Sequence, residues 1–127
     1  MNTRLVRLSL IAVLSIAVRD ATAADAPLAD AAERQNSPAI RALLDQKSNV
    51  NATQADGMTA LHWAAYHDDA KTVSDLLAAG ANSTAANRYG VTPLSLACTN
   101  GNGDIVEQLL AAGSDPNDTL PGGETAL

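Results

Sequence analysis

The sequence predicts an all-α repeat fold, in which helix-turn-helix units joined by short hairpin-like loops stack into a solenoid. A five-residue block that begins at Gly57 returns 33 positions later at Gly90 and again at Gly123. Pairs of leucines keep the same step, at Leu43-Leu44, Leu76-Leu77 and Leu109-Leu110. A fixed period in this range is typical of stacked repeat proteins, in which each unit buries its apolar face against its neighbours.

The N-terminal segment differs from the rest of the chain and is predicted to be a signal peptide over residues 1–23. Arg4 and Arg7 precede an apolar run from Leu8 to Val18, and an A-x-A cleavage site ends at Ala23. The apolar run is shorter than the roughly 20 residues that cross a bilayer. We therefore expect cleavage after Ala23 rather than a retained anchor, and no membrane span in the mature chain. The protein is expected to be exported, periplasmic or secreted, and the Ala-rich signal is typical of bacteria.

The mature chain is expected to be strongly acidic. The full chain carries a net charge of −6 at pH 7. Removal of residues 1–23 takes away three arginines and one aspartate, which leaves −8. Because an acidic surface repels phosphate, nucleic acid is excluded as a partner, and a basic protein partner or simple solubility remains. The single cysteine, Cys98, can form no internal disulfide and is expected to be a small buried thiol.

The 33-residue step divides the mature chain into four copies. They are a capping copy at 24–53, two full copies at 54–86 and 87–119, and a truncated start at 120–127. In the second copy, Thr59 is expected to cap a first helix that ends near Tyr66 or His67. A second helix is expected to run to Ala79, where Gly80 ends it.

The third copy repeats this design. Thr92-Pro93 opens its first helix, residues 100–103 turn the chain, Asp104 starts the second helix and Gly113 closes it. The apolar positions expected to stack between copies are Leu61, Ala64, Ala65, Val73, Leu76 and Leu77, with Leu94, Ala97, Cys98, Val106, Leu109 and Leu110 as their equivalents. Since the fourth copy stops at Leu127, we expect the chain to be the start of a longer repeat protein. The alternative is a complete chain that covers its last face by dimerising.

These motifs resemble the ankyrin repeat family, over nearly all of residues 24–127. The family pattern G-x-T-P-L-H-x-A-A is met by residues 57–65 and 90–98, and the following V-x-x-L-L-x-x-G-A by residues 73–81 and, with serine last, 106–114. The resemblance implies that His62 bonds backbone and neighbouring motif groups. Ser95 stands where the family favours histidine, so a ladder of such histidines is interrupted there.

The resemblance also implies a non-enzymatic protein-binding module that recognises a partner through the concave face of its stacked repeats. The partner-binding positions implied are Ala55, Asp56, Met58, Tyr66 and His67 in the second copy, and Arg88, Tyr89, Val91, Thr99 and Asn100 in the third. Trp63 is expected to pack between repeats rather than to anchor a partner. The alternatives are the recognition arm of a larger exported enzyme or sensor, and a protective accessory of a periplasmic enzyme.

The sequence predicts no catalytic, cofactor-binding or metal-binding residues. It holds no nucleophile elbow, P-loop, H-E-x-x-H or C-x-x-C pattern. Asn100, Asn102 and Asp104 alternate as in a calcium loop, but Ile105 and Ala111 stand where an EF-hand needs glycine and glutamate. The turn between helices explains that run.

Overall fold

A computed structural model describes residues 26–117. Six α-helices and no β-strand form within this range: α2 (Pro27–Glu33), α3 (Ser37–Asp45), α4 (Ala60–Tyr66), α5 (Ala70–Ala78), α6 (Pro93–Asn100) and α7 (Gly103–Ala111). The predicted all-α repeat fold is confirmed. The predicted signal peptide at 1–23 and the truncated copy at 120–127 lie outside the described residues.

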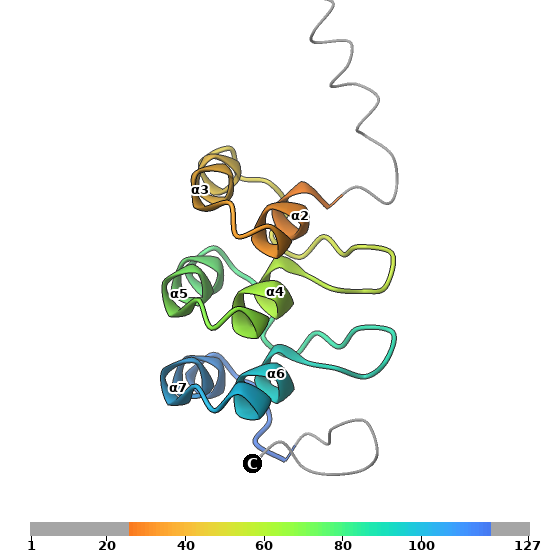
Figure 1. The fold of residues 1–127 in the computed structure, drawn as a ribbon, viewed down its shortest axis with the longest axis vertical. Coiled ribbons are helices and arrows are strands. Elements are labelled where there is room, and N and C mark those ends of the chain that lie inside the picture. Colours follow the sequence, from red (N-terminus) through yellow and green to blue (C-terminus); the bar gives the residue numbers. More distant parts are fainter. Residues whose placement is uncertain (1–25, 118–127) are drawn as a thin grey trace, which may run out of the picture.

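The helices form two parallel columns, which gives the molecule the shape of a short stack (Figure 1). The first helices of the pairs, α2, α4 and α6, lie on top of one another, and α3, α5 and α7 form the second column. The loops between pairs project from the side of the α2–α4–α6 column that faces away from the second column. The solenoid therefore has one side made of first helices and loops, and another made of second helices.

Polar side chains fix the start of five of the six helices. Thr59 and Thr92 accept hydrogen bonds from backbone N–H groups three residues later and so cap α4 and α6, as predicted. Asn36, Asp69 and Asn102 cap the second helices in the same way. The expected start of α7 at Asp104 is one residue late, because the Asn102 amide oxygen accepts from the Ile105 N–H and draws Gly103 into the helix.

The turn inside each pair requires a left-handed residue. Gly101 takes this conformation after α6, with φ of 75°. At the equivalent position of the second copy Asp68 takes it with φ of 60°, and Gln35 in the first copy with φ of 54°. Asp68 tolerates this region better than most residues because its short polar side chain can bond locally. The same turn is thus built in all three pairs, with glycine in only one of them.

The core runs along the interface between the two columns. Leu28, Leu61 and Leu94 hold equivalent places on the first helices, and Leu76 and Leu109 do so on the second helices. All five are essentially inaccessible to solvent. Each short helix therefore gains its stability from neighbours, as expected of a solenoid.

Several positions predicted to be buried are only half-buried. Leu77 and Leu110 lie at the edge of the core. Val106 is half-buried, and the residue before it, Ile105, is fully buried instead. Cys98 is half-buried rather than buried. It lies on α6, the last first helix that the structure describes, so no described helix packs over it as α6 packs over α4.

Candidate functional site

The largest exposed hydrophobic side chains lie on the side formed by first helices and loops. Among the described residues these are Tyr66, which is 53% exposed at the end of α4, and Tyr89, which is 65% exposed in the loop before α6. An aromatic ring exposed to this extent is costly to hydrate and offers a large, rigid contact area. Both tyrosines are among the residues predicted to bind a partner.

Tyr89 stands at the tip of a tight hairpin loop. The Asn87 N–H donates to the Val91 carbonyl at 2.9 Å and closes the loop. The Asn87 side-chain oxygen accepts from the N–H groups of Tyr89, at 2.8 Å, and Val91, at 3.0 Å. The backbone beneath the exposed ring is therefore held in place before any partner arrives. The preceding hairpin closes in the same way, through the Gln54 N–H and the Met58 carbonyl.

The two hairpin tips are joined through their backbones. The Arg88 N–H donates to the Asp56 carbonyl at 2.9 Å, and the Arg88 guanidinium donates to the Ala55 carbonyl at 3.0 Å. Gly57 lies beneath this contact, where an added Cβ would come within 3.0 Å of the Arg88 nitrogen and of the Asn87 Cα. The predicted residues Ala55, Asp56 and Arg88 thus share one surface, which the packing of the tips fixes.

Three predicted residues offer little surface to a partner. Met58 is only 8% exposed, and its sulfur accepts from the Asn87 amide at 3.4 Å. The Asp56 carboxylate accepts from the Met58 N–H and shapes the hairpin. Val91 is half-buried, and its carbonyl accepts from His62 Nε2 at 2.8 Å. Their side chains or backbone groups hold the repeat together, so Tyr89 and Arg88 remain the most available positions at the tips.

The ends of the first helices place the other predicted residues. Thr99 and Asn100 are exposed at the end of α6. The Asn100 amide donates to the carbonyls of Ala65, at 3.2 Å, and Tyr66, at 2.9 Å. Asn100 therefore ties α6 to the end of α4, while Thr99 bonds only within its own helix, to the Ser95 carbonyl.

Tyr66 and His67 belong to a cluster of three rings with Trp63. The Trp63 and Tyr66 rings meet edge to face at a centroid distance of 5.5 Å, and the His67 ring lies 5.9 Å from Trp63 in a stacked arrangement. Trp63 is half-buried and packs against the core, in line with its expected role between repeats. His67 Nε2 donates to the Glu33 carbonyl at 3.0 Å and joins the cluster to α2.

A polar network beside these rings was not predicted from the sequence. The Trp63 indole N–H donates to the Gln54 side-chain oxygen at 2.8 Å. The Gln54 amide donates in turn to Asp30, at 2.7 Å, and to Glu33, at 2.9 Å. The 33-residue step could have identified Asp30 and Glu33 as members of this network. Glu33 stands one step before Tyr66, and Asp30 stands one step before Trp63.

His62 has the structural role that the resemblance implied. It is buried, its Nδ1 accepts from the Thr59 N–H at 3.1 Å, and its Nε2 donates to the Val91 carbonyl of the next loop. Burial lowers the pKa of His62 below its ordinary value of 6.5, and the bond to Val91 and the charge of Asp56 offset this in part. At the equivalent position Ser95 completes a capping box with Thr92 and bonds only within its own repeat, so the histidine ladder is interrupted there.

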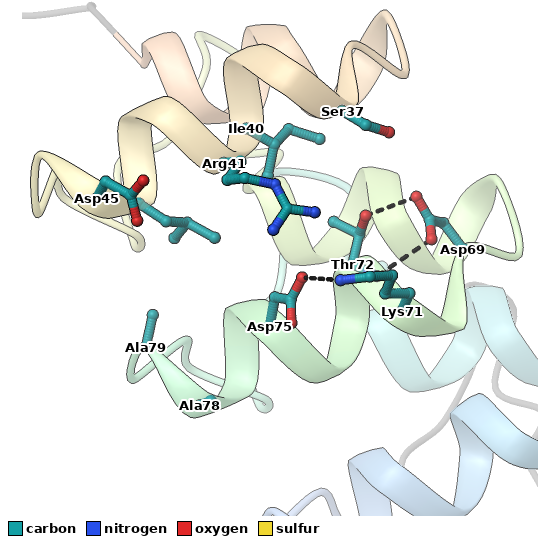
Figure 2. A pocket seen from close by; sticks show the side chains of 11 residues that line it. Ser37, Ile40, Arg41, Asp45, Asp69, Lys71, Thr72, Asp75, Ala78 and Ala79 are labelled. Carbon is teal, nitrogen blue, oxygen red and sulfur yellow. Dashed lines mark hydrogen bonds and ion pairs between the residues drawn. The ribbon is translucent and has the colours of Figure 1, made fainter.

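A further hollow lies on the other side of the stack, between α3 and α5 (Figure 2). It is an open groove of about 420 Å³, into which the Arg41 side chain extends from α3. Its polar groups on α5 have structural partners: Lys71 pairs with Asp75 at 3.0 Å, and Asp69 caps α5 by accepting from Thr72. These contacts hold the polar side chains of α5 in place along one wall of the groove.

Chemical groups for metal or thiol chemistry are scarce in the part of the chain that is described. Residues 26–117 contain no group of three histidine, cysteine or acidic side chains placed to hold a metal ion. Burial raises the pKa of the Cys98 thiol, which disfavours the reactive thiolate. No helix in this range has both the length and the apolar character to cross a membrane.

Comparison with known proteins agrees with the geometry. A family model described as ankyrin repeats matches residues 24–119 in three copies. No curated protein sequence matches the chain. Ankyrin repeats are in general modules for protein interaction and are typically not catalytic. Since the match covers most of the chain, including all six described helices, this protein belongs to the ankyrin repeat family.

Proposed function

We propose that this protein is an exported, non-enzymatic binding module that recognises a partner protein through the side formed by its first helices and hairpin tips. The observation that carries the proposal is the exposure of Tyr66 and Tyr89 on that side, 53% and 65% respectively. Large aromatic side chains dominate the binding energy of many protein interfaces. Rigid loops beneath them reduce the entropy lost on binding.

Contacts between repeats support a preformed surface. The Arg88 N–H bond to Asp56 fixes the two tips, and the Asn100 amide fixes the ends of the two first helices. The groups that partners would touch are therefore held by repeat stacking. Tyr66, His67, Arg88, Tyr89 and Thr99 form the proposed contact set, and Asp56, Met58, Val91 and Asn100 support it.

Site-specific photo-crosslinking in the source cells tests the binding proposal. A benzophenone amino acid replaces Tyr66 or Tyr89 in the full chain, and in a matched control it replaces Glu107, which is exposed on α7 of the other column. We expect the same protein to be crosslinked from positions 66 and 89 and not from position 107. Crosslinking from all three positions alike, or from position 107 alone, would refute the proposed surface.

Export is tested separately on the same cells. Fractionation and N-terminal sequencing are expected to recover a chain that begins at Ala24 outside the cytoplasm, because the predicted cleavage site ends at Ala23. Recovery of a chain that still begins at Met1 from the cytoplasm alone would overturn the proposed localisation and leave the binding proposal to its own test.

A further inference from the structure

Two carboxylates are held together on the side formed by first helices and loops. Asp30 and Glu33, one turn apart on α2, both accept from the same side-chain amide of Gln54, at 2.7 and 2.9 Å. Gln54 has no freedom to turn away, because its oxygen accepts from the Trp63 indole N–H. Two carboxylates that share one donor repel each other because both are negatively charged. The neutral Gln54 amide satisfies hydrogen bonds of both but removes neither charge.

No cation neutralises this pair within residues 26–117. The one ion pair in that range is Lys71–Asp75 on α5. Arg34 follows Glu33 in the sequence but forms no ion pair with it. The second oxygen of each carboxylate, Oδ2 of Asp30 and Oε2 of Glu33, makes no hydrogen bond to any described residue. With respect to the described residues, the pair therefore keeps both unmatched charge and acceptor capacity.

Aromatic rings flank these carboxylates. Trp63 is linked to them through Gln54, and the His67 ring bonds the Glu33 carbonyl. Tyr66 meets both of these rings edge to face and is the most exposed of the three. The face of an aromatic ring attracts a cation, and the attraction is largest for tryptophan and tyrosine. Carboxylates and aromatic faces on one surface therefore favour the same kind of ligand.

We propose that this carboxylate–aromatic patch, formed by Asp30, Glu33, Trp63, Tyr66 and His67, binds an arginine side chain of the partner protein. A guanidinium is planar, donates two parallel hydrogen bonds to a carboxylate and stacks on aromatic rings, whereas an ammonium does only part of this. A metal ion is a poorer fit, since no three ligating groups converge in the described residues. The acidic balance of the whole chain, −6 at pH 7, also favours a basic partner segment. The inference rests on the proposed function and assigns the chemistry that one part of its surface recognises.

The fluorescence of Trp63 gives a local readout, because it is the only tryptophan in the chain. The full-length protein is titrated with a hexa-arginine peptide, and in parallel with hexa-lysine and with hexa-citrulline, which keeps the shape of arginine without its charge. We expect a saturable change with hexa-arginine, a weaker affinity for hexa-lysine and no change with hexa-citrulline. Equal responses to arginine and citrulline, or tighter binding of lysine, would overturn the proposal.

Variants at exposed positions test the patch without threatening the fold. Glu33→Gln and Tyr66→Ala are each expected to weaken hexa-arginine binding at least about fivefold, while Tyr66→Phe keeps the ring face and most of the affinity. Glu107→Gln removes the same charge from α7 on the other column and is expected to leave the affinity unchanged. If Glu107→Gln weakens binding as much as Glu33→Gln does, the peptide senses only net charge, and the patch is refuted.

The two proposals fail in different ways. If crosslinking at positions 66 and 89 captures a partner but Glu33→Gln does not weaken its capture, the arginine site is wrong and the binding surface stands. If the peptide titrations succeed but crosslinking gives position 107 alone, the surface chemistry is right and the proposed binding side is wrong.

Discussion

Two adjacent leucines on α5 should differ sharply in their contribution to stability. Leu76 is completely buried between the helix columns, whereas Leu77 is half-buried at the edge of the core. The period of the sequence assigns both to the apolar face. The structure separates them, because only Leu76 is enclosed on all sides.

The free energies follow from burial. Leu76→Ala removes a fully enclosed side chain and leaves a cavity, which costs about 3–4 kcal/mol of the free energy of unfolding. Leu77→Ala loses about half of the burial term and leaves a gap open to solvent, which costs about 1 kcal/mol. Domains of this size have a total free energy of unfolding of roughly 5–14 kcal/mol. The Leu76 variant should therefore lose a large part of its stability, and the Leu77 variant a small part.

Urea unfolding of the full chain, followed by helical circular dichroism and by the fluorescence of Trp63, measures both variants. At a slope of about 1–1.5 kcal/mol per molar urea, the midpoint should fall by about 2–4 M for Leu76→Ala and by at most about 1 M for Leu77→Ala. The melting temperature should fall by about 12–32 °C for Leu76→Ala and by about 4–8 °C for Leu77→Ala. Equal losses, or a larger loss for Leu77→Ala, would refute the assigned depth of the two side chains.

Two further predictions concern the contacts between repeats. Because burial lowers the pKa of His62 below 6.5, the unfolded chain takes up a proton that the folded chain resists. The free energy of unfolding should therefore fall as the pH drops through 6.5. In His62→Gln this part of the pH dependence should vanish when urea unfolding is measured from pH 8 to pH 5. If the free energy of unfolding of His62→Gln depends on pH as steeply as that of the unchanged protein, the buried neutral ring is contradicted. Gly90→Ala should lower the free energy of unfolding by about 1 kcal/mol, because its φ is positive. Gly57→Ala should lower it by at least about 1 kcal/mol more, because its new Cβ meets the Arg88 nitrogen at 3.0 Å. Equal melting temperatures for the two variants would argue against the close contact of the hairpin tips.

Most of the fold was predictable because local chemistry and period agree. Thr59 and Thr92 are good capping residues at the start of an apolar pattern, and both cap helices in the structure. Gly80 stands just beyond the expected helix end and has a φ of 96°. The depth of each apolar side chain was not predictable in this way. A period identifies the face of a helix, but whether Ile105 or Val106 is fully enclosed depends on the neighbouring column.

The candidate site was predictable only in part, because the period of the sequence gives the register of a residue but not the contacts of its side chain. Tyr66 and Tyr89 occupy positions that the repeat turns outward, so their exposure follows from register. Met58 occupies a similar position, yet the Asn87 side chain and the next hairpin cover it. The bonds of Gln54 to α2 join residues more than 20 positions apart and depend on side-chain lengths, which no periodic pattern encodes.

The backbone contact between hairpin tips has a consequence for how this surface can change. The Arg88 N–H and the Asp56 carbonyl set the spacing of neighbouring tips, and neither group depends on the identity of its own side chain. Substitutions at positions 88 and 89 can therefore alter which chemical groups are displayed while the pitch at which they are displayed stays constant. Substitutions in one repeat after another could therefore replace one partner that matches this pitch by a different one. The specificity of the surface can evolve in this way without redesign of the scaffold.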